Sequence, residues 1–178
     1  MTAQTQTRTS TRRWIELIRA GWGAALLIAP GTVLTHIHHV RVDTRAIAIT
    51  RILGARQLAQ AALSGNNPSP EVLAMGIWVD GAHAVTGLTL AALDRSRARA
   101  ALTDTAVAAL WAGVGLRDLN QGVATPPQHD RRRDALARLV LRLVPGGDAL
   151  LGHADRDRSG LRKDERHGSA DGVPGHGR

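Results

Sequence analysis

Residues 71–93 read EVLAMGIWVDGAHAVTGLTLAAL, in which Glu71, Asp80 and His83 are the only ionisable side chains. A helix on the surface of a soluble protein is polar over about half of its circumference. Beyond Glu71, a helix over this segment would be apolar nearly all round. Pro70 and Glu71 suit the first turn of such a helix. The segment therefore predicts a helix surrounded by other helices or by lipid.

Three other apolar segments of similar length lie at residues 14–34, 46–63 and 100–119. Polar links separate them, among them the turn sequence SGNNPSP and the charged run DRSRAR. Short links favour antiparallel neighbours, and Pro30 is expected to kink or end the first helix. The sequence therefore predicts an all-α fold, a four-helix transmembrane bundle over residues 14–122.

The charges inside these segments are the main objection to a membrane location. An Arg or Asp at the centre of a spanning helix costs about 2.5 to 3.5 kcal/mol. The two arginines of the second segment match two aspartates in the third and fourth, and intramembrane charges usually turn inward and pair. A soluble helical domain stays open as the alternative. Small residues four apart, which let helices approach, occur at Gly21 and Ala25, Gly87 and Ala91, and Ala108 and Ala112.

The composition restricts the chemistry and the partners. The 178 residues suit one compact domain with tails, and the absence of cysteine excludes disulfides and thiolate chemistry. The net charge of +8 is almost all arginine, since Lys163 is the only lysine. Phe and Tyr are absent, so the stacking platforms of single-strand binders are missing and no nucleic acid partner is expected. The expected partner is the lipid bilayer, with a homo-oligomer or a second membrane protein as further candidates.

The regions outside the bundle are polar. Residues 1–13 and 145–178 are predicted to be disordered tails, and residues 123–133 a linker. Residues 134–144 have leucines at helical spacing and predict a basic amphipathic helix on an anionic membrane surface. The alternative is a short helix packed on the bundle. The membrane-surface arginines are Arg131, Arg132, Arg133, Arg138 and Arg142.

A polar centre is predicted inside the bundle. Asp80 and His83 are three residues apart and therefore share one helix face. The centre either binds a small anion or relays protons, with His83 titrating near neutrality, or forms a buried ion-pair network that fixes helix register. We favour the ion-pair network, because paired charges need no ligand to explain them. Its predicted members are Arg51, Arg56, Asp80, His83 and Asp104.

Two motifs in this centre resemble a known family. Residues 51–56 read RILGAR, an R-x-L-G-x-R pattern, and Trp78, Asp80 and His83 form a W-x-D-x-x-H pattern. Together they resemble an uncharacterised family, a domain of unknown function, of small four-helix bacterial membrane proteins. The resemblance covers residues 14–119. It implies a helical membrane architecture and carries no known reaction.

Neither of two candidate metal sites is convincing. His36, His38 and His39 can ligate zinc or copper by residue type, but no second set of ligands lies nearby in the sequence. The run DRDRSG from Asp155 imitates the start of a calcium loop, yet the twelfth position is Arg166, where a bidentate Glu belongs. No metal and no cofactor are expected.

These features predict a structural or accessory protein of the bacterial cytoplasmic membrane without catalytic activity. One alternative is a membrane carrier or an anion-binding module that uses the buried Arg, Asp and His groups. A second alternative is a soluble helical domain whose basic tails bind nucleic acid.

Overall fold

The computed structural model describes residues 2–39, 42–65, 68–121 and 131–170 of the chain. Over these residues it consists of seven α-helices and one π-helical turn, and the described part contains no strand. The prediction of an all-α fold is confirmed.

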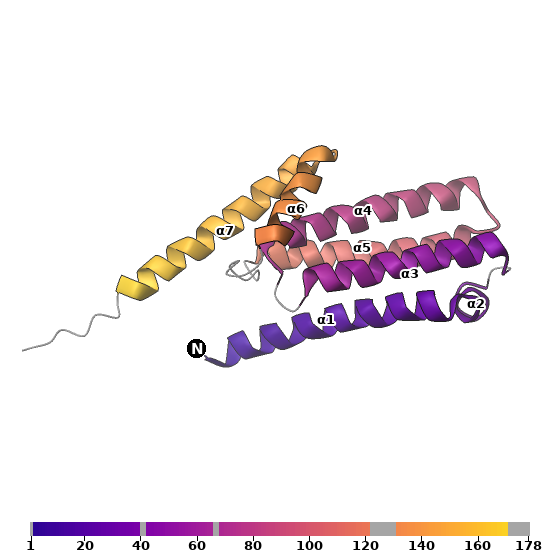
Figure 1. Ribbon diagram of the computed structural model, residues 1–178, viewed down its shortest axis with the longest axis horizontal. Coiled ribbons are helices and arrows are strands. Elements are labelled where there is room, and N and C mark those ends of the chain that lie inside the picture. Colours follow the sequence, from indigo (N-terminus) through magenta and orange to yellow (C-terminus); the bar gives the residue numbers. More distant parts are fainter. Residues whose placement is uncertain (1, 40–41, 66–67, 122–130, 171–178) are drawn as a thin grey trace, which may run out of the picture.

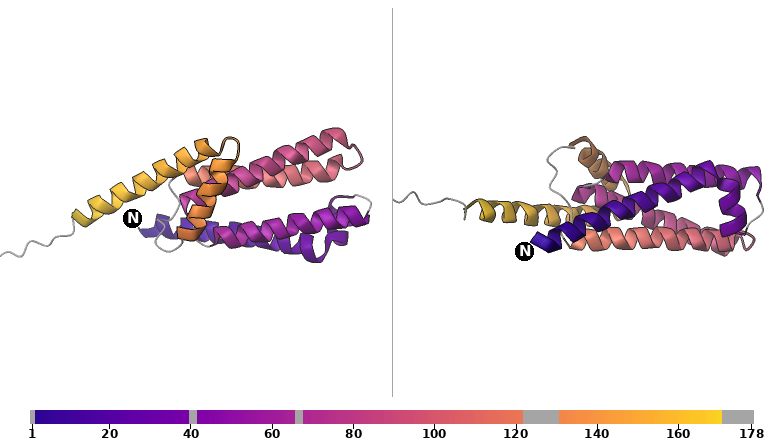
Figure 2. Two further views of the ribbon diagram at one scale, coloured as in Figure 1. Left: turned by 45° about the horizontal axis from the view of Figure 1, so that its top comes forward. Right: turned by 90° about the horizontal axis from the view of Figure 1, so that it is seen from below.

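Four long helices run side by side along the molecule (Figure 1). They are α1 (Thr2–Ile28), α3 (Thr44–Ser64), α4 (Pro70–Leu93) and α5 (Ala98–Asn120). Successive long helices run in opposite directions, and they pack mainly as two pairs, α1 with α3 and α4 with α5. Figure 2 shows the two pairs as two layers. The contact between backbones is far more extensive within each helix pair than between the two pairs.

Glycines allow the close approach within each pair. A Cβ atom added at Gly54 of α3 would lie 2.7 Å from the carbonyl oxygen of Gly23 in α1. In the other pair, a Cβ at Gly87 would collide with the side chain of Thr105. Gly87 therefore lies at a helix contact, as its sequence spacing predicted. Gly21 does not, because the α1 contact is made two residues later and a Cβ at Gly21 would meet nothing within 4 Å.

The first helix is broken at the proline. α1 ends at Ile28, and Pro30 occupies the first turn of the short helix α2 (Pro30–Thr32), which continues into the π-helical turn η1 (Val33–Ile37). The two parts meet at an angle of 98°. The missing N–H and the ring of proline disfavour a continuous helix, so the predicted break is confirmed.

The next two long helices begin at side-chain caps. Ala46 N donates to Asp43 Oδ1 at 2.7 Å at the start of α3, and Val72 N donates to Ser69 Oγ at 3.3 Å at the start of α4. Each cap satisfies a backbone donor that has no partner inside the helix. Pro70 is the first residue of α4, as predicted.

The largest apolar core lies at the end of the bundle, where α6 (Arg131–Leu143) and α7 (Gly147–Ala170) pack against α4 (Figure 1). Gly146 joins these two helices with a φ of 75°, a conformation that glycine adopts without strain. Trp78 Nε1 donates to the carbonyl oxygen of Pro145 at 2.9 Å. The core is formed by Val72, Ala74, Met75, Leu119, Ala137, Leu141, Leu151 and Ala154.

The predictions for the tails need correction. α1 begins at Thr2 and α7 spans 147–170, so residues 2–13 and 147–170 are helical where disordered tails were predicted. Extending an existing helix adds one hydrogen bond for each residue fixed and avoids the cost of nucleation. α7 also has Leu151 and Ala154, which are buried against α4 and α6.

The predicted amphipathic helix over 134–144 corresponds to α6, which begins three residues earlier, at Arg131, and ends at Leu143. Its first three residues had been assigned to the linker. The rest of that linker, within 122–130, and residues 1 and 171–178 of the predicted tails lie outside the described residues.

Length and hydropathy do not support four spans. Within the described residues, α4 is the one helix that is long and apolar enough to cross a membrane. The bent segment Ile15–Ile28 with Pro30–Ile37 passes the same test when it is taken as one span. α3 and α5 do not pass.

Candidate functional site

Asp80 forms the centre of the interior charges. Its side chain is 1% exposed. Oδ2 accepts from Arg19 Nη2 at 3.0 Å and Oδ1 accepts from Arg56 Nη2 at 2.9 Å. The three residues come from α4, α1 and α3, so this carboxylate ties one helix pair to the other. Each oxygen has a cationic donor, which offsets the cost of removing the carboxylate from water.

Arg19 makes two further contacts. Its guanidinium lies over the ring of Trp111 in α5, 5.0 Å from the centroid, and its Nε lies 3.9 Å from Glu16 Oε2. A cation over an indole face is attracted by the ring quadrupole. Arg19 is only 6% exposed. Through its contacts with Asp80 and Trp111 it links α1 to both α4 and α5.

A second pair lies one turn along α4. His83 Nε2 and Asp104 Oδ2 are 2.5 Å apart, and the two side chains are each 17% exposed. This hydrogen bond connects α4 to α5. Both residues of this hydrogen bond belong to the α4–α5 helix pair, whereas Asp80 connects that helix pair to the α1–α3 pair.

The predicted polar centre is thus partly right. Arg56 and Asp80 meet, and His83 and Asp104 meet, but Arg51 lies exposed on α3. Five residues of α-helix turn through about 500°, so Arg51 and Arg56 lie about 140° apart around the helix. They cannot both face the interior.

The structure adds Arg19 to the centre in place of Arg51. The sequence contains only a weak signal for it, the spacing that places Arg19, Gly23 and Leu26 on one helix face. The structure shows that this face is buried. A cavity of about 30 Å³ lies beside Arg19 and Asp80, which is room for one or two water molecules.

The buried face of α3 is polar beyond this centre. Its buried residues are Thr50, Gly54, Gln57 and Gln60. Gln57 is 2% exposed and Gln60 8% exposed. Within the described part of the chain, Gln57 Oε1 and both amide atoms of Gln60 have no hydrogen-bond partner. This helix turns its polar side chains inward and exposes Ile49 and Ile52.

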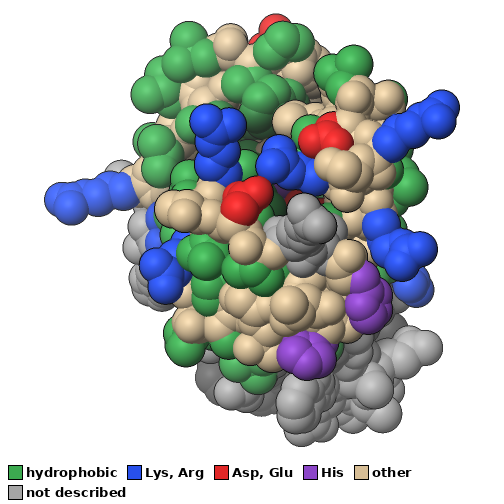
Figure 3. Space-filling model, turned by 90° about the vertical axis from the view of Figure 1, so that its right-hand side faces the viewer, with side chains coloured by type: hydrophobic (Ala, Val, Ile, Leu, Met, Phe, Trp, Pro, Cys, Tyr) green, Lys and Arg blue, Asp and Glu red, His purple; other side chains and the backbone are tan. Residues whose placement is uncertain are grey.

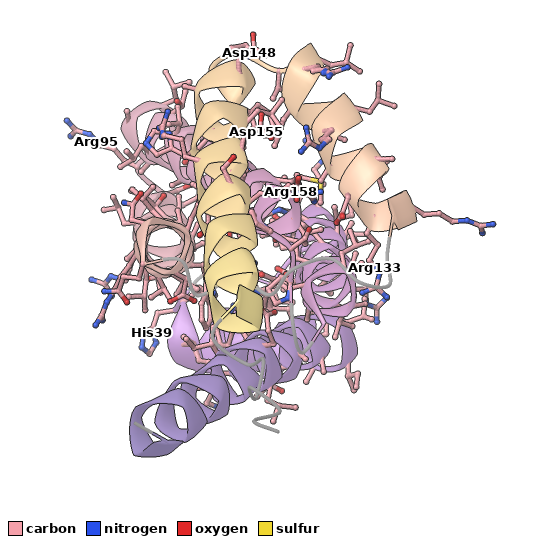
Figure 4. All side chains as sticks on the ribbon, turned by 90° about the vertical axis from the view of Figure 1, so that its left-hand side faces the viewer. His39, Arg95, Arg133, Asp148, Asp155 and Arg158 are labelled. Carbon is pink, nitrogen blue, oxygen red and sulfur yellow. The ribbon has the colours of Figure 1, made fainter. Side chains whose placement is uncertain are left out.

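A second charged cluster, which we call the Glu71 cluster, fastens α6 and α7 to the start of α4. Glu71 is 0% exposed, and its Oε1 lies 2.5 Å from Arg138 Nη2 of α6 and 2.7 Å from Arg158 Nη2 of α7. Arg138 also contacts Asp155 at 2.9 Å, and Arg158 contacts Asp134 at 3.3 Å. Figure 4 shows Asp155 and Arg158 on the side of α7 that faces α6.

The Glu71 cluster stabilises the charged form of Arg138. Burial disfavours the charged form of Arg138, but the hydrogen bonds and charges of Glu71 and Asp155 outweigh burial and raise the pKa of this guanidinium. Glu71 was expected only to suit the first turn of the helix, and its role in this cluster was missed because its partners lie 67 or more residues away.

The predicted membrane-surface arginines therefore have different environments. Arg138 is half-buried and paired with Glu71. Arg132 and Arg142 are exposed, and Arg133 Nη1 donates to the carbonyl oxygen of Leu63 at 3.2 Å. The side chain of Arg131 lies outside the described residues.

The two sequence motifs considered for metals are arranged differently from metal sites. His36 and His39 are exposed whereas His38 is buried, and the described residues contain no group of three or more His, Asp or Glu side chains close enough to hold a metal ion. The run that starts at Asp155 is part of α7, and a calcium loop requires an irregular backbone.

No family model, curated protein or solved structure matches the chain. The resemblance to small four-helix membrane proteins therefore stays a prediction, and the geometry alone bears on function. Both oxygens of Asp80 are engaged by arginines, and Asp104 is engaged by His83. Such an arrangement holds helices together.

Proposed function

We propose that this chain is an integral protein of the bacterial cytoplasmic membrane, a structural or accessory four-helix bundle without catalytic activity. α1, α3, α4 and α5 lie in the bilayer, and the ion pairs of Asp80 together with the hydrogen bond between His83 and Asp104 hold them in register. The observation that carries this proposal is the reversed polarity of the long helices, whose polar side chains face inward and whose large apolar side chains face outward.

α3 has the clearest reversed polarity. Gln57 and Gln60 are buried, while Ile49 is 51% and Ile52 67% exposed. Full burial of a large apolar side chain in water gains about 1.5 to 3 kcal/mol, and each of these half-exposed isoleucines forgoes roughly half of that gain. In lipid the outward isoleucines face an apolar solvent, and the side-chain amides of Gln57 and Gln60 are buried away from that solvent.

The other long helices repeat this arrangement. Val85 and Leu88 of α4 and Leu102 and Leu110 of α5 are each at least half exposed. Figure 3 shows one end face of the molecule, where charged side chains lie near the middle and also project from the left and right edges, and apolar side chains gather over the upper part.

The exposed threonines of α4 also fit a bilayer. Thr86 Oγ1 donates to the carbonyl oxygen of Ala82, and Thr89 Oγ1 donates to that of Val85, both at 2.9 Å. Their hydroxyl groups are satisfied within the helix, as polar groups in contact with lipid must be.

The low hydropathy of α3 and α5 is compatible with this proposal. The polar residues that lower the hydropathy of α3 include Arg56, Gln57 and Gln60, all on its inner side. Arg51 faces outward, but it lies seven residues from the start of α3, about 10 Å along the axis, and its side chain can reach the headgroups. The Asp104 carboxylate of α5 is paired with His83.

The two alternatives have less support. Asp80 already bridges Arg19 and Arg56 at 3.0 and 2.9 Å. An anion would have to displace the Asp80 carboxylate from both arginines. The basic surface available to a nucleic acid is reduced because Arg138 and Arg158 pair with Glu71.

Membrane fractionation of the full-length chain tests the proposal. We expect the protein to stay in the membrane pellet through washes with high salt and alkaline carbonate and to be released by mild detergent. Release by salt or carbonate, with a folded monomer in detergent-free buffer, would overturn it.

A further inference from the structure

A cavity of about 110 Å³ lies between the two helix pairs, at the end of the molecule that carries α2 and η1. Its walls are mainly apolar, with Leu26, Leu34, Leu53 and Leu90 contributed by α1, η1, α3 and α4. An engineered apolar cavity of about 150 Å³ in another protein holds a benzene molecule. The present cavity is smaller and is partly open to its surroundings, so it accommodates no more than about one six-membered ring.

One buried polar group lines this cavity and lacks a partner. His38 follows η1, is 6% exposed, and its Nδ1 has no hydrogen-bond partner among the described residues. Burial lowers the pKa of His38, an effect that the charge of Asp104 only partly offsets. The imidazole is thus neutral near pH 7, with Nδ1 able to donate or accept according to its tautomer.

The charged groups at the cavity already have polar partners. Asp104 is hydrogen-bonded to His83 at 2.5 Å. Arg97 lies 3.5 Å from Asp43 and 3.7 Å from Asp94. A charged ligand would lose hydration against apolar walls without an unpaired charge to receive it. These groups favour an uncharged ligand.

We propose that this cavity is a binding site for a small uncharged single-ring phenol, whose ring fills the apolar space and whose hydroxyl group hydrogen-bonds to His38 Nδ1. A hydroxyl group both donates and accepts, so it satisfies either tautomer of the imidazole. The site goes beyond the structural role proposed above. It uses none of the Arg19, Arg56 and Asp80 contacts and does not depend on where the helices reside.

Fluorine NMR of two ligands tests the site. 4-Fluorophenol and fluorobenzene are titrated against the purified full-length chain in detergent micelles, with empty micelles as the reference for partitioning. We expect saturable, protein-dependent broadening for both ligands, with the phenol bound about 2- to 10-fold more tightly because of one additional hydrogen bond. Equal affinities for the two ligands would overturn the proposal.

Variants separate the ring from the hydroxyl contact. His38→Leu is expected to lower the affinity for 4-fluorophenol to that for fluorobenzene and to leave fluorobenzene binding unchanged. His36→Leu is the matched control, because His36 is exposed two residues away, and should change neither. An unchanged phenol affinity in His38→Leu would contradict the hydroxyl contact.

A cavity-filling variant gives a test that does not depend on His38. Ala100 lines the cavity from α5 and is half-buried, so Ala100→Leu should abolish saturable binding of both ligands. Retained binding would place the ligand elsewhere and overturn the site. Should the protein prove soluble without detergent, the same titrations in buffer test this site separately from the membrane proposal.

Discussion

Arg51 and Arg56 lie five residues apart on α3 and have different environments. Arg56 donates to Asp80 and to the carbonyl oxygen of Val79, whereas Arg51 is exposed. Both arginines were predicted to belong to one polar centre because two arginines matched the two aspartates in number. Helical spacing separates them by about 140°, so this error was avoidable from the sequence. The pairing of Arg19 with Asp80 spans 61 residues, and no local pattern specifies such a partner.

Replacing Asp80 should destabilise the protein strongly. Asp80→Asn leaves the guanidinium groups of Arg19 and Arg56 without their shared carboxylate in a buried site. Removing one partner of a buried ion pair typically costs about 3 to 5 kcal/mol. Thermal unfolding in detergent, followed by circular dichroism, measures the change. Asp94→Asn, in the link between α4 and α5, is the control and should have little effect. Equal melting temperatures for the two variants would contradict the central role of Asp80.

The two arginines of α3 provide a matched comparison. Arg56→Gln should lower the melting temperature because Asp80 loses one of its two cationic donors, while Arg51→Gln removes the same charge from an exposed position. The same unfolding assay distinguishes them. A larger loss for Arg51→Gln would mean that α3 is rotated about its axis relative to the structure.

At the scale of whole helices, the positions of the prolines were the most predictable features from sequence. Pro30 breaks the first segment and Pro70 starts α4 as expected, because proline acts on its own backbone. The contact between Gly23 and Gly54 was missed. α1 contains many small residues among its apolar ones. Which of these small residues contacts α3 depends on how α3 packs against α1.

The contact between α1 and α3 depends on Gly54. Gly54→Ala places a Cβ atom 2.7 Å from the carbonyl oxygen of Gly23 and 2.8 Å from the backbone nitrogen of Leu27. The two helices must move apart, and overpacking of this kind costs about 1 to 3 kcal/mol. Ala55→Leu, at the adjacent exposed position, is the control. Unfolding in detergent should show a loss for Gly54→Ala alone, and an unchanged melting temperature would exclude this contact.

The docking of α6 and α7 depends on Glu71. Glu71→Gln removes the charge that Arg138 and Arg158 share. α6 and α7 should therefore detach more often from the start of α4. Hydrogen exchange measured by mass spectrometry should show faster exchange over residues 132–159 and little change in α3. Asp94→Asn, at the opposite end of α4 from Glu71, is the comparison and should leave exchange in α6 and α7 unchanged. Uniform exchange across the chain would indicate global destabilisation instead of undocking.

At the scale of the whole molecule, the outward faces separate a membrane bundle from a soluble one. Val85 of α4 is 64% exposed. In water, a charge at such a surface position changes stability by about 0.5 kcal/mol or less, whereas in the bilayer an aspartate near a helix centre costs about 2.5 to 3.5 kcal/mol. Val85→Asp should therefore reduce the fraction of the protein that resists carbonate extraction from membranes. Arg95→Asp changes the charge of the exposed link after α4 and should leave that fraction nearly unchanged. If Val85→Asp is inserted as efficiently as the unmodified chain, this face of α4 does not contact lipid, and the exposed apolar side chains must instead be covered by another protein or by water.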